Sequence, residues 1–133
     1  LRDYVASQQS DIYADKQLRL VICLANGNKP VGMVDLYDFS PRHLHAWVAI
    51  MVAREHQGRG VARMALDLLA DYAFHFLHIR VLMSMVAEDN EPSIILFGAA
   101  GYRQCGLFPS FYLRDSRPVN GLCLCLTKPE NLT

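Results

Sequence analysis

The segment "REHQGRGVARMAL", residues 54–66, decides the fold, because it places two glycines between an apolar run and a helical pattern. The apolar run is "AWVAIMV", residues 46–52, which is typical of a strand buried on both faces. Glycine starts helices poorly, and each glycine costs conformational entropy on folding. Gly58 and Gly60 therefore indicate a loop that needs bare backbone.

The rest of the chain divides by hydrophobic periodicity and turn residues into one predicted domain, residues 1–133. Residues 1–9 are ambiguous, and we interpret them as the end of a helix. The predicted strands are 17–25, 30–39, 44–52, 81–87, 103–114 and 119–127, and the predicted helices are 60–77 and 89–102, with turns at "NGN" (26–28) and "SRPVNG" (116–121). The order β-β-β-α-β-α-β-β predicts a mixed α/β sheet.

The strand, helix and strand over residues 44–87 predict a parallel pair joined by a right-handed crossover. Open α/β sheets bind ligands at the carboxyl ends of such strands, which is where the glycine loop lies. A helix start offers free N–H groups and a partial positive charge, and Arg59 and Arg63 can add to it. We therefore expect a phosphate-bearing cofactor.

Three phosphate motifs compete for this loop. A P-loop requires a Gly-Lys pair, and the sequence has none. The dinucleotide fingerprint requires glycine or alanine where the chain has Arg63. The acetyl-coenzyme A pattern Q/R-x-x-G-x-G/A fits at every specified position, which are Gln57, Gly60 and Ala62.

At these residues the chain resembles the GNAT superfamily of N-acetyltransferases, most closely the bacterial spermidine and ribosomal-protein acetyltransferases. The segment "DNEPSIILFGAAGY", residues 89–102, is similar to that family's next helix, and "KPVGMVDL", residues 29–36, resembles its return strand. The resemblance covers about residues 17–127. It implies the GNAT fold, with a splayed parallel strand pair at its centre and a truncated N-terminal part.

The resemblance further implies an enzyme that moves an acetyl group from acetyl-coenzyme A to an amine of a small molecule or protein by direct attack. The pantetheine arm is expected on the first splayed strand and the pyrophosphate on the glycine loop. The expected cofactor-binding residues are Ile50, Met51, Val52, Gln57, Gly58, Arg59, Gly60, Val61, Ala62, Arg63 and Asn90. The candidates for deprotonating the amine are Asp35, Glu88 and His45.

The chain departs from the family at two informative positions. Trp47 stands where the spermidine enzymes carry a glutamate, and Phe97 stands where the family has its usual acid, a tyrosine. Phe97 has no proton to give. These departures keep an alternative open, an acyl-coenzyme A binding module with lost or weak catalysis.

Composition narrows the class of protein further. The 13 basic and 13 acidic residues balance, which argues against nucleic acid or an anionic membrane as a partner, and leaves a homo-oligomer open. No apolar run reaches the roughly 18–20 residues that cross a bilayer, and we expect a cytoplasmic protein.

Cys123 and Cys125 share one strand face, and no C-x-x-C pair occurs, so we expect four reduced thiols and no metal. His43 and His45 share a strand face without an obvious third ligand.

Overall fold

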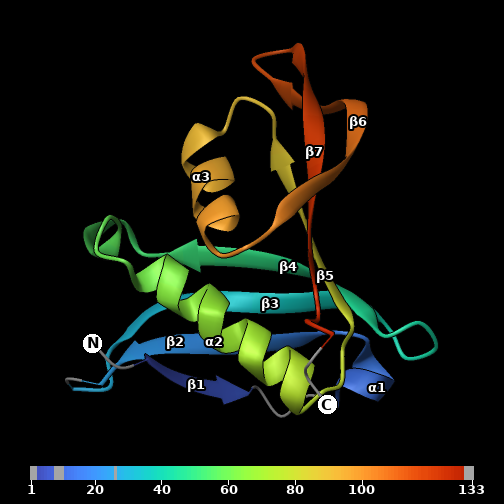
Figure 1. Ribbon diagram of the computed structural model, residues 1–133. Coiled ribbons are helices and arrows are strands. Elements are labelled where there is room, and N and C mark those ends of the chain that lie inside the picture. Colours follow the sequence, from blue (N-terminus) through green and yellow to red (C-terminus); the bar gives the residue numbers. More distant parts are fainter. Residues whose placement is uncertain (1–2, 8–10, 26, 131–133) are drawn as a thin grey trace.

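The computed structural model describes residues 3–7, 11–25 and 27–130. One seven-stranded sheet runs through the molecule in the order β1-β2-β3-β4-β5-β7-β6, which confirms the mixed α/β class (Figure 1). The strands are β1 (Asp3–Ser7), β2 (Leu18–Leu24), β3 (Pro30–Ser40), β4 (His45–Val52), β5 (Val81–Ala87), β6 (Arg103–Arg114) and β7 (Arg117–Thr127). The helices are α1 (Ile12–Asp15), the 3-10 turn η1 (Arg54–His56), α2 (Val61–His75) and α3 (Glu91–Ala99). None of these helices is both long and apolar enough to cross a bilayer.

The antiparallel strands β1 to β4 form a platform on which α2 lies (Figure 1). Alternation along the strands sends one set of apolar side chains toward the helix, among them Ile22, Leu36 and Val48, each at most 1% exposed. Leu66 and Leu69 of α2 meet this face, at the three-residue spacing that gives a helix one apolar side. The predicted amphipathic helix thus covers the predicted meander.

The parallel pairing between β4 and β5 is short. Only His45, Ala46 and Trp47 pair, with Val81, Leu82 and Met83, and beyond them the two strands diverge. This confirms the splayed parallel pair. On its other side β5 pairs along its whole length with β7, and β6 closes that end of the sheet as an edge strand.

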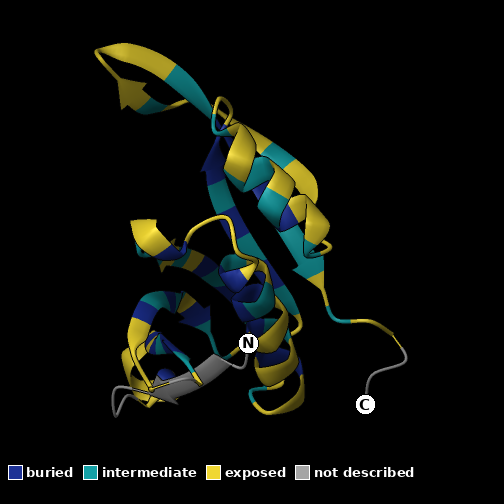
Figure 2. Cartoon of the chain, turned by 90° about the vertical axis from the view of Figure 1, so that its left-hand side faces the viewer, coloured by how far each residue is buried: buried dark blue, intermediate teal, exposed yellow. Residues whose placement is uncertain are grey.

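The β6–β7 hairpin corrects one predicted turn. The chain reverses at Asp115 and Ser116, both at positive φ (50° and 64°), and not over residues 116–121. Pro118 is tolerated in the strand because that part of β7 pairs with β6 alone. Gly121 serves close packing, since a Cβ there would lie 3.0 Å from Met85 Sδ. The tip of this hairpin is exposed (Figure 2).

The N-terminal prediction was also wrong. Asp3–Ser7 form a strand that pairs antiparallel with β2, where a helix end was expected, and α1 follows it. The Asp11 side chain caps α1 by accepting from Tyr13 N–H, and Ile12, 5% exposed, anchors the short helix in the core. The other residues of this predicted segment, 1–2 and 8–9, lie outside the described residues, as does Asn26 of the predicted "NGN" turn.

The expectation of four reduced thiols is wrong for two of them. Cys105 and Cys125 form a disulfide between β6 and β7, whereas Cys23 and Cys123 are free and buried. Cys123 and Cys125 do share one strand face, as expected, because they face Met85 and Met83 in register. The partner of Cys125 comes from the neighbouring strand, and this pairing depends on a register that the sequence pattern does not specify.

Candidate functional site

The gap between β4 and β5 begins at a buried hydrogen bond. Directly after the last strand pair, Ser84 Oγ donates to the Val48 carbonyl at 3.1 Å. Ser84 is 3% exposed, so this bond supplies the partner that a continued ladder would have supplied. Sequence reasoning missed Ser84, because a single serine in an apolar strand carries no distinctive signal.

Inside this gap Ile50 offers backbone groups that pair with no residue in the described part of the chain. The Val48 carbonyl accepts from Ser84, and the Val52 carbonyl accepts from the Gln57 side-chain amide at 3.0 Å. Backbone groups alternate in direction along a strand, so those of Ile50, midway between, point the same way. β5 does not pair with β4 at this level. The geometry thus leaves an N–H and a C=O available to a ligand in extended conformation.

The conformation of the glycine loop explains why the sequence has two glycines there. Gly58 and Gly60 both adopt the left-handed conformation, with φ of 78° and 81°, which side chains other than glycine's adopt at a cost. A Cβ at either position would meet nothing within 4 Å, so the space above the loop is open. The glycines provide both the turn and an accessible backbone.

Helix α2 begins immediately after this loop with its N–H groups free. Gly60 is the N-cap residue, and no side chain caps the helix. The first turn of a helix has no intrahelical acceptors for its N–H groups, and the helix dipole places a partial positive charge there. Asp11 caps α1 and Asn90 caps α3, so α2 is the uncapped helix among these three. Its N-terminus is suited to an anion.

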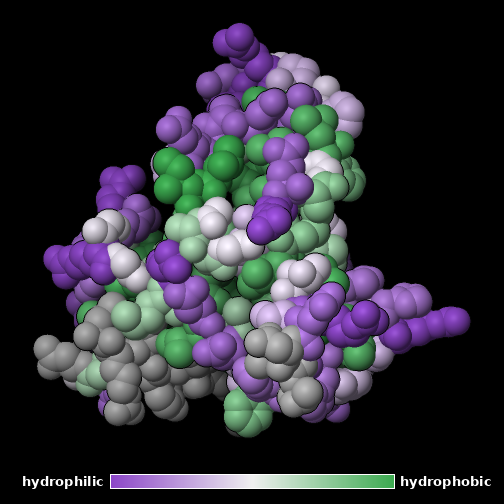
Figure 3. Space-filling model, viewed as in Figure 1, coloured by the Kyte–Doolittle hydropathy of each residue, from purple (hydrophilic) through white to green (hydrophobic). Residues whose placement is uncertain are grey.

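A cavity of about 550 Å³, here called the loop cavity, opens over this helix start. Its walls come from the end of β4, the glycine loop, the first turn of α2 and the near side of α3. The lining residues are Ile50, Val52, His56, Gln57, Gly58, Gly60, Ala62, Arg63, Asn90, Pro92, Ser93, Ile95 and Leu96. Figure 3 shows apolar side chains over α3 on this side of the molecule, and Ile95 is 62% exposed.

A second cavity of about 310 Å³, here called the gap cavity, lies in the opening between β4 and β5. The lining residues are Tyr37, Val48, Ala49, Ile50, Ser84, Met85, Val86, Ala87, Asn90, Ser93, Phe97, Tyr112 and Arg114. Ile50, Asn90 and Ser93 line both cavities. The two cavities therefore adjoin at these three residues, one over the start of α2 and the other in the gap between the strands.

Comparison with known proteins identifies this arrangement. Residues 2–102 match the model of the acetyltransferase (GNAT) family. The chain belongs to the GNAT family. This confirms the family and the fold that the sequence predicted.

The chain is similar to the spermidine N(1)-acetyltransferase of Vibrio cholerae, with 30% identity over 83% of this chain and 60% of that protein. It is 27% identical to the Escherichia coli K12 spermidine N(1)-acetyltransferase, over 92% of this chain and 68% of that one. A crystal structure of the Vibrio cholerae spermidine N-acetyltransferase with CoA and spermine superposes with a TM-score of 0.81 at 25% identity, covering 87% and 68% of the two chains. The chain thus spans 60% of the length of the first of these relatives.

Most, but not all, of the expected cofactor-binding residues of this GNAT chain line the loop cavity. Met51 and Arg59 are exposed and line neither cavity, and Met51 points its side chain away from α2 with 66% exposure. Val61 is 2% exposed and packs into the core with Ile22 and Val31. The expected residues that line the cavity are Ile50, Val52, Gln57, Gly58, Gly60, Ala62, Arg63 and Asn90.

His56 is a residue of the loop cavity that sequence reasoning missed. It is 9% exposed, and neither ring nitrogen has a hydrogen-bond partner among the described residues. Its position immediately before Gln57 in the quoted segment is the signal that could have drawn attention to it.

The two carboxylates expected to act as bases lie outside the gap cavity. Asp35 accepts two hydrogen bonds from Arg19, at 2.9 and 3.0 Å, and this pairing raises the pKa of the Arg19 guanidinium. Asp35 lines a third cavity, which adjoins the gap cavity at Tyr37 and Ala49. Glu88 is exposed at the end of β5 and lines a shallow hollow with Asp89.

His45 is even farther from the gap. It is three residues before Val48, the first residue of β4 that lines the gap cavity, about 10 Å along an extended strand. Its ring stacks on His43 with centroids 6.1 Å apart, and within the described ranges these two histidines belong to no group of three possible metal ligands. Trp47 is half-buried and stacks on Tyr37 at 6.5 Å, outside the apolar core.

Phe97 and two tyrosines are the aromatic side chains of the gap cavity. Phe97 is 4% exposed and packs edge-on against Tyr102, with ring centroids 5.0 Å apart. Burial raises the pKa of Tyr112, and burial followed by the charges of Asp38 and Tyr112 raises the pKa of Tyr37. Both phenols therefore stay protonated well above neutral pH. Sequence reasoning missed Tyr112, because it reaches the gap from the far end of the sheet.

Proposed function

We propose that this chain transfers the acetyl group of acetyl-coenzyme A to an amine. The observation that carries the proposal is the adjacency of the loop cavity and the gap cavity, which share Ile50, Asn90 and Ser93. At one end, the free N–H groups at the start of α2 suit a pyrophosphate, with Arg63 beside them. At the other end, the backbone of Ile50 suits the amides of a pantetheine arm.

The reaction is proposed to be a direct transfer in one step. The amine nitrogen attacks the thioester carbon, an N–C bond forms as the C–S bond breaks, and the sulfur leaves as a thiolate. Fixing the two reactants in one gap supplies much of the rate enhancement, because the reaction no longer depends on a bimolecular encounter. A deprotonated amine and a proton for the thiolate complete the requirements on the protein.

Tyr112 is our proposed proton donor for the departing thiolate. Phe97 cannot donate, and Tyr112 lines the same cavity with a hydroxyl whose pKa is raised by burial. Arg114, two residues later and in the same wall, lies 3.2 Å from Asp89, so an exposed ion pair links the hairpin to the segment that follows β5.

Glu88 is our proposed proton acceptor for the amine, acting through water at the rim. It follows Ala87, which lines the gap cavity, and Glu88 takes part in none of the ion pairs that the described residues form. Asp35 remains a candidate but is weaker, since Arg19 occupies both of its oxygens. Spermidine is the first acceptor to test, because the similar relatives are spermidine acetyltransferases.

One observation favours a second candidate function, acyl-coenzyme A binding without efficient catalysis. Phe97 is buried in the gap wall where the family has its acid. A cytoplasmic location and a homo-oligomer remain predictions under either function.

Steady-state release of coenzyme A, measured with acetyl-coenzyme A and a panel of amines including spermidine, tests the proposal. We expect turnover with at least one amine and formation of the N-acetylated product by mass spectrometry. Tight coenzyme A binding without any product would favour the binding module. The absence of both coenzyme A binding and acetylated product would overturn the proposal.

A further inference from the structure

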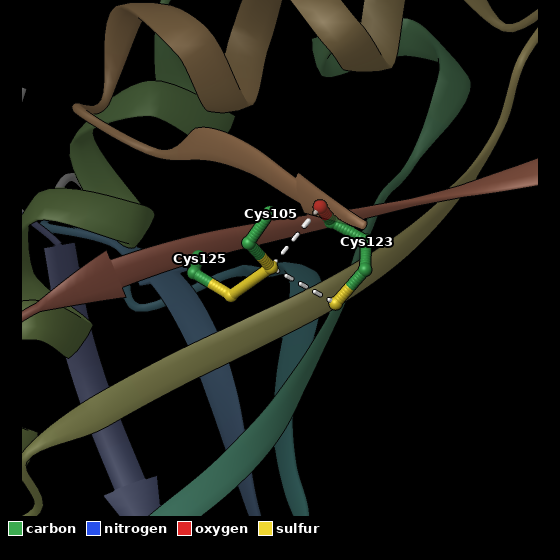
Figure 4. A group of neighbouring side chains, drawn as sticks. All are labelled: Cys105, Cys123 and Cys125. Atoms are coloured by element: carbon green, nitrogen blue, oxygen red, sulfur yellow. Dashed lines mark hydrogen bonds between the residues drawn. A yellow bond between two sulfur atoms is a disulfide. The ribbon is translucent and has the colours of Figure 1, made fainter. Parts of the chain in front are cut away.

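Five sulfur-bearing side chains gather on one face of the sheet, away from the loop cavity. Cys123 and Cys125 alternate along β7, and their direct partners across the ladder on β5 are Met85 and Met83. Residues directly opposite each other on one sheet face have Cβ atoms about 5 Å apart. Cys105 joins them from β6 (Figure 4).

A β-bulge brings Cys105 to this face. Gln104 pairs with Leu124 and Gly106 pairs with Cys123, so Cys105 is the extra residue in β6. A bulge places two residues of one strand opposite a single residue of its partner and re-aims their side chains. As a result, the Cys105 sulfur lies beside both cysteines of β7.

The three cysteine sulfurs are close enough to share one ligand. All three Sγ atoms lie within 4.8 Å of one another, and Cys105 Sγ is 3.4 Å from Cys123 Sγ. Cys105 and Cys125 are bonded, with Cα atoms 6.1 Å apart. Cys105 is exposed, Cys125 half-buried and Cys123 buried, so the group is reachable from solvent at one edge.

We propose that, once a dithiol or phosphine reductant has opened the Cys105–Cys125 bond, the three thiols bind one soft monovalent cation of the Cu⁺ class. Reduction takes up two electrons from the reductant, which is oxidised, and two protons. A dithiol supplies these protons itself, whereas with a phosphine they come from a water molecule whose oxygen ends on the phosphine oxide. Each thiol that then coordinates releases one proton, since the thiolate is the ligand. The sequence predicted no metal site, because its cysteines lack the tight ligand spacing of such sites. Cys105, the third ligand, is 18 residues from Cys123.

The donor set selects the cation. Thiolate and thioether ligands favour soft ions, and the group contains no histidine or carboxylate. Zn²⁺ in structural sites requires four ligands, whereas this face offers three thiolates with two methionine thioethers beside them. A metal–sulfur bond of about 2.3 Å implies sulfur atoms about 4 Å apart in a planar three-coordinate site. Reduced thiols in van der Waals contact already approach this spacing.

Burial of Cys123 sets a condition for binding. Because Cys123 is buried, a cation must reach it from the edge of the group where Cys105 is exposed. The site is independent of the proposed acetyl transfer, although Met85 also lines the gap cavity.

The test is anaerobic titration of reduced protein with Cu⁺ in competition with a chromogenic Cu⁺ chelator. We expect one Cu⁺ per chain, and we expect Cys123→Ser to weaken binding by more than about tenfold. Cys23→Ser is the matched control, since Cys23 is an equally buried free thiol on β2. Binding of Cu⁺ by wild type that Cys123→Ser leaves unchanged, or no binding at all, would overturn the proposal. Tighter binding of Zn²⁺ would overturn the choice of cation.

A second measurement needs no variant and guards against misfolding. Cu⁺ is expected to protect Cys105 and Cys125 of reduced wild type, the two cysteines of the group that are not buried, from alkylation, as measured by mass spectrometry. Equal alkylation with and without Cu⁺ would contradict the site. Coenzyme A binding, measured on the same samples, reports failure of the proposed function separately.

Discussion

Ser84 Oγ donates a hydrogen bond to the Val48 carbonyl at the point where β4 and β5 stop pairing. On one side of this bond β4 and β5 are paired, and on the other side the gap between them begins. A carbonyl that loses its partner in a buried site costs about 1–3 kcal/mol. Ser84→Ala is therefore expected to lower the free energy of unfolding by this amount, measured by urea denaturation. Ser93→Ala, whose hydroxyl donates no hydrogen bond within the described part of the chain, is the control and is expected to change it less.

Tyr112→Phe tests the proposed proton donor. We expect kcat to fall by about 10²-fold or more, because a positioned acid contributes about 10²–10⁴-fold. The Michaelis constant for acetyl-coenzyme A is expected to stay nearly constant, since the phenol does not line the loop cavity. Tyr72→Phe, on the exposed side of α2, serves as the control. Unchanged kcat in Tyr112→Phe would remove Tyr112 from the mechanism.

Phe97→Tyr tests whether the family's acid position still works in this chain. Phe97 lines the gap cavity, so we expect a hydroxyl added to its ring to supply a proton donor there. We expect a higher turnover rate and a nearly unchanged Michaelis constant for acetyl-coenzyme A. If wild type is already fast and the variant is slower, Phe97 is a wall of the acceptor pocket. If both are inert with every amine, the binding-module alternative gains support.

Tyr102→Phe isolates a pH-dependent contribution to stability. The Tyr102 hydroxyl is buried without a hydrogen-bond partner among the described residues, and burial, with a smaller effect of Asp67, strongly raises its pKa. Unfolded tyrosine ionises near pH 10, so wild-type stability is fully present below that pH and falls as pH rises above it. The variant is expected to lose less stability between pH 9 and 11. At pH 7 we expect it to be at least as stable as wild type, because it no longer buries an unpaired hydroxyl.

Urea denaturation of both proteins across that pH range checks the expectation. The free energy of unfolding is compared between the two proteins at each pH. The difference reports on Tyr102, because wild type and variant have all other titrating groups in common. Parallel curves would show that Tyr102 ionises as freely in the folded state as in the unfolded one.

Local sequence signals predicted the platform and the loop. Gln57, Gly58 and Gly60 fall within one short segment of the sequence. The strand before it and the helix after it are visible from periodicity alone. Ser84, Tyr112 and Cys105 were not predicted as functional, because each acquires its role from a residue on another strand. Their partners depend on how β5, β6 and β7 are placed in register, including a bulge that no local pattern specifies.

The N-terminal error has a similar cause. Asp3–Ser7 form a strand because β2 offers a free edge, and the polar sequence of that segment does not reveal this edge. Tertiary pairing overrides local preference in such short strands.

The central claim is that the start of α2 binds the pyrophosphate of coenzyme A. Isothermal titration of coenzyme A into wild type, Gly60→Glu and Gly27→Glu tests it most directly. Both glycines have positive φ, 81° and 89°, and both have open space where a side chain would go, but Gly27 lies in the β2–β3 turn and does not line the loop cavity. We expect wild type and Gly27→Glu to bind coenzyme A with similar affinity and Gly60→Glu to bind it at least tenfold, about 1.4 kcal/mol, more weakly. Equal affinity in all three proteins, or no binding by wild type, would contradict the account.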